Sequence, residues 1–492
     1  MKKSFYSVLI LILIFLGFLL RLNQYLAKPS IWLDETALVW NIVNRSYFGL
    51  LKPLSLDQSA PVGFLILSKL IINFIGNNEY TLRLISQITG LSSVILFYFL
   101  AKRLLSKNSI IIALILFVFS APLITYSTMF KQYSSDLAIG LILYLVFLNS
   151  LDSRITSVKL LILIFLGGIS VWFSQTAVII LASLEIYILL VLIKEKKFKD
   201  LIKYLIIFAA SVISFYVNYF FVLSKSIAIP GLRDYWSDKF APWPIWSNFG
   251  WYRDNFMAVF KFPLGLNFPL IGLGLFILGS IYFFKENKKN LLLLLLPVLL
   301  TLFASLLKVY PFSVRLLIFL TPFFYIIIAH GLGKMFSKKN IFISLVGAIF
   351  LAWLIIPFIL QARSDFINKP VMESVRPAMQ YYLNNRQTGD VLYIYYGAIV
   401  QYQYYLSYFK AEPAQNTVTG VNRMKGINVY DYAQDLDKLK GKKRVWLLFS
   451  HDSVIHGIDE EDFFVNYLNS IGKRLDNYSA PGTSIYLYDL SQ

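Results

Sequence analysis

Long apolar runs separated by short polar gaps dominate the chain. Eleven of these runs are expected to span a membrane, and several approach the roughly 20 apolar residues that a helix needs to cross the hydrocarbon core of a bilayer. The pattern therefore predicts an α-helical protein that passes through a membrane many times, with a first run long enough to be a retained helix rather than a cleaved signal peptide. The expected spans are residues 4–22, 84–101, 109–126, 134–150, 158–174, 176–193, 201–223, 267–284, 290–307, 312–332 and 341–360.

Basic residues predict the orientation of these helices. Lys and Arg are concentrated in alternate gaps, for example at Lys102, Arg103 and Lys107 and in residues 194–199. Cytoplasmic loops carry an excess of Lys and Arg, so we expect these gaps to lie in the cytoplasm. The N-terminus is then inside, and everything after residue 360 is outside.

One further apolar stretch, residues 61–75, is not counted as a span. It is short, and it carries Lys69 and Asn73, which are four residues apart and therefore share a helix face. If it crossed the bilayer, every later basic gap would move outside. We therefore expect an interfacial helix within a structured first outer loop, residues 23–83. A second long outer loop, rich in Trp, Pro and Tyr, covers residues 224–266.

Beyond residue 360 the pattern changes to alternating strands and helices. This alternation indicates a small extracytoplasmic α/β domain, residues 361–492, following a transmembrane catalytic domain, residues 1–360. The α/β domain shows no phosphate-binding glycine motif. The sequence leaves open whether this domain binds an acceptor or covers the membrane site. The expected helices are residues 377–384, 398–408 and 461–471, and the expected strands are residues 390–396, 443–450 and 484–489.

Composition supports a membrane protein and excludes several kinds of site. The chain of 492 residues is 57% apolar and 15% charged, whereas soluble domains are about 45–50% apolar and about 25% charged. The formal charge of +19 does not indicate nucleic-acid binding, because the charged residues lie mostly in the short gaps between apolar runs. The absence of cysteine excludes disulfides and thiolate chemistry, and three histidines do not indicate a His-rich metal site.

Candidate chemistry lies where expected spans meet the outer surface. Two acids follow the first span, a basic and acidic group begins the fourth, and a Tyr and an Arg lie between the ninth and tenth. Charged residues at a membrane boundary are functional candidates. These residues are Asp34, Glu35, Lys131, Tyr133, Asp136, Tyr310 and Arg315.

This set suits transfer of a sugar from a polyprenyl phosphate. A carboxylate such as Asp34 can act as base toward an acceptor hydroxyl. Arg315 offers bidentate phosphate recognition and Lys131 a point charge, so the leaving phosphate would be neutralised. Glu35 then orients the acceptor or caps the following helix, where an acid is favourable.

Simpler interpretations stay open for several of these residues. Asp136 could pair with Lys131 or Arg315 only to hold helices together. In the second outer loop, Arg233 and Arg253 are weaker candidates for substrate contacts, because its aromatic residues are also typical of an interfacial belt. Asp57 lies in the first outer loop, where a turn explains it equally well.

The order of these features resembles the GT-C glycosyltransferases. The resemblance rests on Leu33-Asp34-Glu35, the surface stretch beginning Ala60-Pro61 and the segment Glu79-Tyr80-Thr81-Leu82-Arg83-Leu84. Similar elements follow at residues 131–136 and 310–315. The nearest branch is the bacterial group of aminoarabinose transferases and Rgt-type lipopolysaccharide sugar transferases, with protein O-mannosyltransferases more distant.

The resemblance implies an inverting transfer from a polyprenyl-phosphate sugar on the outer, periplasmic face of a bacterial plasma membrane. Asp34 matches the acid assigned as catalytic base, residues 131–136 match the second acidic position, and Arg315 corresponds to a lipid-phosphate contact. The acceptor would be a glycan, a lipid or a protein. Metal use varies in the superfamily, so a divalent metal stays open and no ligands are assigned.

Two other classes of function compete with an enzyme. A transporter or flippase of lipid-linked sugars would share the many spans and the basic residues. Transporters usually show paired repeats and polar residues at mid-depth, whereas no convincing repeat is found here. A membrane scaffold would leave Asp34, Asp136 and Arg315 unexplained.

Overall fold

The computed structural model describes residues 3–337, 340–421, 429–451, 454–455 and 458–491. The chain divides into two compact units. The helical unit comprises residues 1–27, 45–71 and 82–369. The sheet unit comprises residues 28–44, 72–81 and 370–492. Two pieces of the first outer loop are thus grouped with the C-terminal residues, and the predicted catalytic division at residue 360 stays a prediction.

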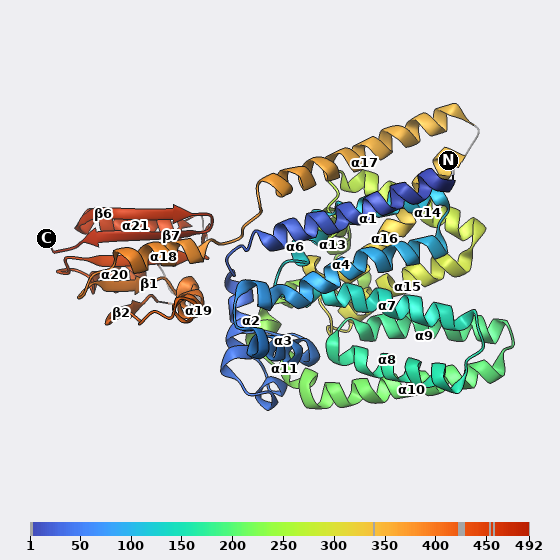
Figure 1. Cartoon of the computed structure of the whole chain (residues 1–492), viewed down its shortest axis with the longest axis horizontal. Coiled ribbons are helices and arrows are strands. Elements are labelled where there is room, and N and C mark those ends of the chain that lie inside the picture. Colours follow the sequence, from blue (N-terminus) through green and yellow to red (C-terminus); the bar gives the residue numbers. More distant parts are fainter. Residues whose placement is uncertain (1–2, 338–339, 422–428, 452–453, 456–457, 492) are drawn as a thin grey trace. The chain divides into compact units, whose positions relative to one another are not determined.

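Helices make up the helical unit (Figure 1). The α-helices are α1 (Lys3–Leu26), α3 (Val62–Ile75), α4 (Glu79–Leu104), α5 (Lys107–Val118), α6 (Ala121–Tyr126), α7 (Tyr133–Leu151), α8 (Ser157–Phe173), α9 (Ala177–Lys194), α10 (Phe198–Asn218), α11 (Ser224–Ile227), α12 (Pro230–Tyr235), α13 (Phe249–Lys261), α14 (Pro269–Glu286), α15 (Lys288–Leu306), α16 (Thr321–Ser337) and α17 (Ile341–Ile367). Short helical turns are η1 (Phe48–Leu51), η2 (Tyr219–Leu223), η3 (Ser237–Lys239), η4 (Ile245–Ser247) and η5 (Val314–Leu320).

The predicted membrane architecture is confirmed. Among the described residues, nine helices are long and apolar enough to cross a membrane, and they coincide with nine of the expected spans. The other two expected spans, residues 109–126 and 158–174, fall on the shorter apolar helices α5 with α6, and α8. The number of crossings and their orientation stay predictions. The expected interfacial helix forms as α3, and its place at the membrane surface is likewise a prediction.

The expected span at residues 109–126 is interrupted at Ser120. Helix α5 ends at Val118, and α6 begins at Ala121 with Pro122 in its first turn. The Ser120 hydroxyl accepts the Leu123 N–H at 3.5 Å, so it caps the new helix. Since proline suits the first turn of a helix but not its interior, this local sequence starts a second helix inside an apolar run.

Helix α16 is the central helix of this unit. The apolar stretch Val314–Phe336, which comprises η5 and nearly all of α16, is 94% buried in its most apolar part, as expected for a helix that is apolar on all sides. Its contact with α14 depends on glycines, because a Cβ at Gly279 would lie 2.0 Å from the Ile327 carbonyl oxygen. Small residues of this kind let membrane helices approach closely.

Gly279→Ala is expected to destabilise the helical unit, because the obstacle is backbone and cannot rotate away. Overpacking of this kind costs about 1–3 kcal/mol. Gly274→Ala is the matched control on the same helix, because a Cβ there meets nothing within 4 Å. Thermal unfolding of the two purified variants in detergent measures the difference. Equal midpoints would show that α14 and α16 do not depend on this close approach.

The sheet unit is an α/β structure. Its main sheet has the order β2-β1-β3-β7-β6, in which β1 is parallel to β2 and β3, and β7 is antiparallel to β3 and β6. The strands are β1 (Val391–Ile394), β2 (Asn416–Thr419), β3 (Val445–Ser450), β6 (Lys473–Ala480) and β7 (Thr483–Asp489), with a separate pair β4 (Val454–Ile455) and β5 (Ile458–Asp459). Its helices are α2 (Leu33–Asn44), α18 (Val375–Asn385), α19 (Ile399–Phe409), α20 (Val429–Asp437) and α21 (Glu460–Ile471), with η6 (Tyr396–Ala398).

Helices cover both faces of this sheet. Every residue of β3 is buried, which is typical of a strand that is covered on both sides. On one face, Trp446 contacts Tyr382 of α18 edge to face. On the other face, Phe449 contacts Phe464 of α21, with ring centroids 5.3 Å apart.

All six elements predicted after residue 360 are present, as α18, β1, α19, β3, α21 and β7. The described residues also contain elements that were not predicted, namely β2, β4, β5, β6, α20 and η6. In the main sheet, the missed strands β2 and β6 lie at the edges and are largely exposed. Edge strands carry polar and charged residues, so they lack the apolar run by which β3 was recognised.

Candidate functional site

The acidic pair lies in the first turn of α2, in the sheet unit. Asp34 is half-buried, whereas Glu35 is fully buried. Glu35 Oε2 accepts the Trp32 N–H at 3.4 Å. Trp32 directly precedes the helix, so this contact is one half of a capping box, in which an acid in the first turn binds the N-cap amide. The geometry favours the capping role for Glu35 and leaves Asp34 as the accessible acid.

A second group of candidates lies at the start of α7, in the helical unit. Lys131 is 7% exposed, and its Nζ donates to Gln58 Oε1 at 2.9 Å. Its carbonyl oxygen accepts from the Ser86 hydroxyl on α4 at 3.1 Å. The Tyr133 ring lies edge to face against Tyr126, with centroids 5.1 Å apart. The basic residue and the tyrosine are therefore fixed by neighbouring helices.

Asp136, one turn further along α7, is an unusual carboxylate. It is 5% exposed, and its Oδ1 atom is buried without a hydrogen-bond partner in the described part of the chain. No salt bridge of Asp136 occurs among the described residues, so the expected pairing with Lys131 or Arg315 is not what holds it. A buried polar atom without a partner is rare and requires an explanation.

Tyr310 belongs to the same group. It lies in the loop between α15 and η5, and its hydroxyl donates to the Leu316 carbonyl at 2.8 Å. Burial raises the pKa of the Tyr310 hydroxyl well above its ordinary value, and the nearby Asp136 carboxylate and Tyr133 hydroxyl raise it further. The structure thus places Tyr310 near Asp136 and Tyr133, while a role of these residues in a common site stays a prediction.

Arg315 is placed by an aromatic residue of the second outer loop. Its guanidinium carbon lies 5.7 Å from the centroid of the Trp236 ring, a cation–π distance. The same loop binds the chain next to Tyr310, because the Phe312 N–H donates to the Lys239 carbonyl at 3.0 Å. The long loop is therefore a structured cover over the segment that carries Tyr310 and Arg315.

Asp57 also contacts the second outer loop. Its φ of 49° is typical of a turn, and a Cβ at Gly231 would lie 2.3 Å from its Oδ2 atom. Only a glycine leaves room for the carboxylate at that position of α12. Arg233 lies two residues further along the same short helix. The contact places Asp57 against the short helix that carries Arg233.

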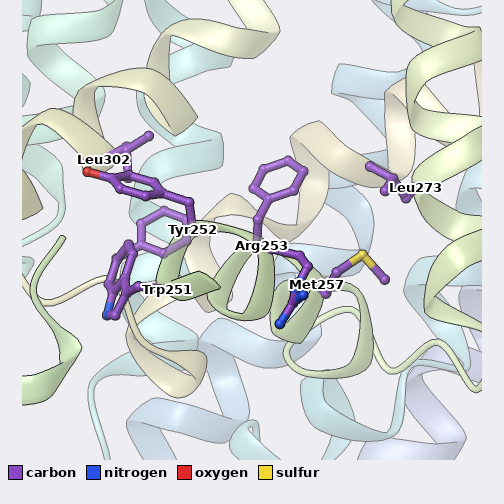
Figure 2. Close-up of a pocket in the computed structure, with 8 residues that line it drawn as sticks. Trp251, Tyr252, Arg253, Met257, Leu273 and Leu302 are labelled. Atoms are coloured by element: carbon purple, nitrogen blue, oxygen red, sulfur yellow. The ribbon is translucent and has the colours of Figure 1, made fainter. Parts of the chain in front are cut away.

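Arg253 lies beside an apolar cavity in the helical unit. The guanidinium pairs with Asp254, with Nε 2.7 Å from Oδ1, and the side chain is mostly exposed. The cavity has a volume of about 350 Å³ and lies between α13 and the helices α14 and α15 (Figure 2). Its other lining residues are Trp251, Tyr252, Phe256, Met257, Leu273, Leu302 and Phe312.

Several residues with a role in this architecture were not predicted. Gln58, the partner of Lys131, looks like an ordinary loop residue, and no local pattern marks it. Glu79 lies in the segment quoted for the resemblance, but nothing there predicted its ion pair with Arg376, whose Nη1 is 2.8 Å from Glu79 Oε1. Among the described residues, no group of three or more His, Asp or Glu side chains is arranged to hold a metal ion.

Comparison with known proteins gives one sequence match and several structural matches. Residues 58–220 match the family model of dolichyl-phosphate-mannose-protein mannosyltransferases. This match includes Lys131, Tyr133 and Asp136 but not Asp34. A search of curated protein sequences finds no significant match.

The structural matches extend over the whole chain. ArnT from Cupriavidus metallidurans, in a structure with bound undecaprenyl phosphate, is similar with a TM-score of 0.55 and 9% identity over 99% of this chain and 98% of that one. The oligosaccharyltransferase of Archaeoglobus fulgidus is similar with a TM-score of 0.52 and 12% identity, over 100% of this chain and 75% of that one. At these identities the likeness is one of fold.

Proposed function

The chain has the fold of the GT-C superfamily of glycosyltransferases, and on this premise we propose that it transfers a sugar from a polyprenyl-phosphate donor to an acceptor hydroxyl. The reaction takes place at the outer face of a bacterial plasma membrane, with the N-terminus inside. The observation that carries the proposal is the fold match over nearly the full length of both chains to a protein with undecaprenyl phosphate bound.

Asp34 is the general base. It removes the proton from the acceptor hydroxyl, whose oxygen forms a bond to the anomeric carbon of the sugar. The bond between that carbon and the phosphate oxygen breaks, and polyprenyl phosphate leaves with the electron pair, so the configuration inverts. Because Asp34 is half-buried while Glu35 is buried and bonded to the Trp32 N–H, Asp34 is the acid that a substrate can reach.

Lys131 and Arg315 neutralise the phosphate of the donor. Each contributes a positively charged side chain, and an arginine can bind two phosphate oxygens at once. Tyr133, Asp136 and Tyr310 bind the polar part of the donor, and a sugar hydroxyl would supply the donor that Asp136 Oδ1 lacks. No general acid is needed, because a neutralised phosphate is a good leaving group.

The second outer loop provides weaker contacts. Asp57, Arg233 and Arg253 lie in or against this loop and could contact the substrate at its edge. The apolar cavity beside Arg253 offers aromatic and aliphatic walls of the kind that bind hydrophobic ligands. We assign these contacts to affinity rather than to chemistry.

Incubation of the purified protein with a panel of polyprenyl-phosphate sugars tests the proposal. Released polyprenyl phosphate and a glycosylated acceptor are measured together, with glycans, lipids and peptides offered as acceptors. Coupled release and transfer from one donor supports an enzyme. Movement of a lipid-linked sugar across proteoliposome membranes without its cleavage would contradict it and would support a flippase.

Arg315→Ala is expected to weaken donor binding and to change the pH dependence of sugar transfer little. Loss of a charge-assisted hydrogen bond costs about 1.5–3 kcal/mol, which raises the Kd about tenfold to a hundredfold. Titration with the polyprenyl-phosphate sugar measures this change. Lys239→Ala is the control. Lys239 belongs to the second outer loop, which covers the segment that carries Arg315, but its side chain is ion-paired with Asp238. Equal donor affinity in both variants would exclude a phosphate role for Arg315.

A further inference from the structure

Residues 28–32, which lead into the acidic pair, form neither helix nor strand. Helix α1 ends at Leu26 and α2 begins at Leu33. Such a segment cannot satisfy its own backbone, and buried backbone groups require partners. Ile31 is fully buried. The hydrogen bonds that fix this segment must therefore come from another part of the chain.

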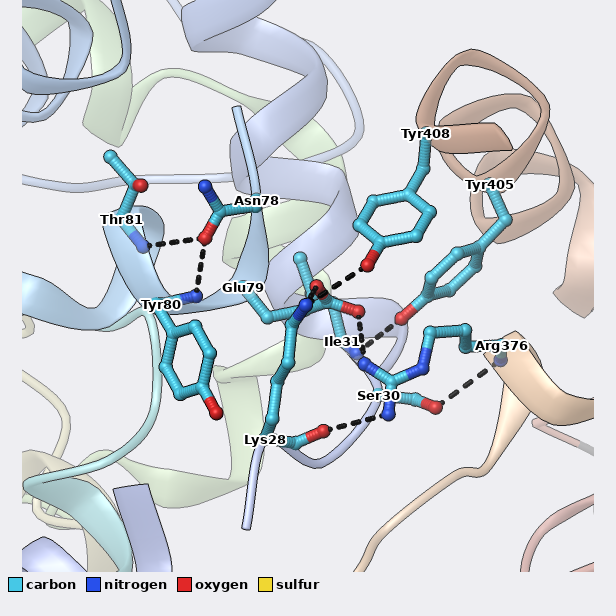
Figure 3. A network of polar contacts seen from close by, with 10 residues as sticks. All are labelled: Lys28, Ser30, Ile31, Asn78, Glu79, Tyr80, Thr81, Arg376, Tyr405 and Tyr408. Atoms are coloured by element: carbon cyan, nitrogen blue, oxygen red, sulfur yellow. Dashed lines mark hydrogen bonds and ion pairs between the residues drawn. The ribbon is translucent and has the colours of Figure 1, made fainter. Parts of the chain in front are cut away.

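Side chains of the C-terminal residues supply those hydrogen bonds. The Ile31 N–H donates to the Tyr405 hydroxyl on α19 at 2.8 Å. Two residues further, the Leu33 N–H donates to Glu373 Oε2 at 2.9 Å. These two bonds hold the backbone on the approach to Asp34 and at its immediate neighbour. Figure 3 shows the first of them, between Ile31 and Tyr405.

Arg376 holds the beginning of the same segment. Its Nη2 donates to the Lys28 carbonyl at 3.0 Å, and its backbone N–H donates to the Ser30 hydroxyl at 3.2 Å. Its Nη1 binds Glu79 at 2.8 Å. Lys28 Nζ in turn donates to the Tyr408 hydroxyl at 3.0 Å (Figure 3). Arg376 thus connects the segment to the start of α4 as well as to α18.

Glu373 is the centre of the arrangement near Asp34. It is 5% exposed, and besides the Leu33 N–H it accepts from Gln401 Nε2 and lies 2.7 Å from His451 Nδ1. His451 directly follows β3, so the carboxylate is fixed by the sheet and by α19. A carboxylate at the first amide of α2 also suits the positive end of the helix dipole. Glu373 therefore caps α2 from a distant part of the sequence.

We propose that Glu373, Arg376 and Tyr405 are positioning residues that fix the start of α2 and, with it, the place of Asp34. The inference rests on the proposed function, since it assigns these residues a role in the same reaction. They contact the backbone that carries the base and take no part in the chemistry. A misplacement of about 1 Å can reduce turnover about a hundredfold.

Kinetics of three variants test the inference. Tyr405→Phe removes only the oxygen that accepts the Ile31 N–H, and Glu373→Ala removes the acceptor of the Leu33 N–H. We expect kcat to fall about tenfold to a hundredfold in each, while KM for donor and acceptor stays within about twofold. Glu373→Gln keeps an acceptor oxygen and is expected to recover part of the lost kcat.

Tyr402→Phe is the matched control. Tyr402 lies on the same helix, is 4% exposed, and its hydroxyl also accepts a backbone N–H, that of Ala414 at 3.4 Å. That bond lies within the C-terminal residues and does not touch the segment before Asp34. If Tyr405→Phe and Glu373→Ala match this control in kcat, the inference is overturned. It is also overturned if KM and kcat change together with the thermal midpoint, which indicates a general structural role.

A second measurement does not depend on catalysis. Hydrogen exchange of the backbone amides in residues 28–36 of the full-length protein reports whether the segment is held. We expect faster exchange there in Tyr405→Phe and Glu373→Ala than in Tyr402→Phe. Unchanged exchange overturns the inference even if the protein is a transferase. Conversely, a protein that transfers no sugar but shows the faster exchange refutes the proposed function while the tethering of the segment stands.

Discussion

Asp34→Asn is expected to reduce sugar transfer by about 10²- to 10⁴-fold, the usual contribution of a positioned general base. The amide has nearly the shape of the carboxylate but cannot accept the proton of the acceptor hydroxyl. Binding of the polyprenyl-phosphate donor should stay at the wild-type level, because the cations assigned to the phosphate are elsewhere in the chain. Single-turnover transfer and equilibrium donor binding measure the two quantities separately.

Two further variants make this result specific. Glu35→Gln is expected to lower turnover less than Asp34→Asn, because an amide oxygen can still accept the Trp32 N–H. Asp238→Asn is the control for loss of an acid, since Asp238 is exposed and paired with Lys239. If Glu35→Gln were the inactive variant and Asp34→Asn turned over normally, the assignment of the base would be reversed.

Arg376→Met is expected to cause the largest loss of stability in the sheet unit. The Glu79 side chain is fully buried, with Arg376 Nη1 at 2.8 Å and Lys28 Nζ at 3.5 Å. Breaking a buried ion pair costs about 3–5 kcal/mol, and the cost here should fall at or below the lower end because Lys28 stays and Arg376 is 27% exposed. Methionine retains most of the apolar stem of the arginine side chain, so the loss of stability measures the contribution of the positive charge.

A double-mutant cycle separates the pair from its surroundings. Adding Glu79→Gln to Arg376→Met should restore part of the stability, because a neutral amide is cheaper to bury than an unpaired carboxylate. Arg386→Met is the control at the C-cap of the same helix, since Arg386 donates to the Glu412 carbonyl and lies over the Tyr382 ring, and neither contact involves Glu79. Equal thermal midpoints for Arg376→Met and Arg386→Met would show that the pair with Glu79 contributes nothing.

The sequence predicts the elements that depend on local pattern. Each expected span falls on helical structure, and only residues 109–126 are divided between α5 and α6. Helices form because an apolar run of bilayer length has few other ways to satisfy its backbone. The break at Ser120 was not predicted, since one Ser and one Pro hardly change the apolar character of residues 109–126. Strand β6 was missed for a similar reason, because its exposed face reads as a polar loop.

The candidate site could be predicted only where a local sequence pattern marks its residues. Asp34 and Glu35 stand out as an acidic pair after an apolar run, and their local capping contact with Trp32 follows from adjacency. Their distant partners do not stand out. Leu33 and Glu373 are 340 residues apart, and Lys131 and Gln58 are 73 residues apart. Pairings over such distances depend on the fold and leave no pattern in a single sequence.

The distance between the acidic pair and its tethers also bears on biosynthesis. The segment before Asp34 is made first, and the side chains that hold it, Glu373, Arg376 and Tyr405, belong to the last quarter of the chain. While the ribosome is still adding the intervening helices, the Ile31 and Leu33 amides lack their acceptors. In a nascent or truncated chain, Asp34, the proposed base, would therefore not be held in place. On this proposal, the protein becomes competent for transfer only when its synthesis is nearly complete.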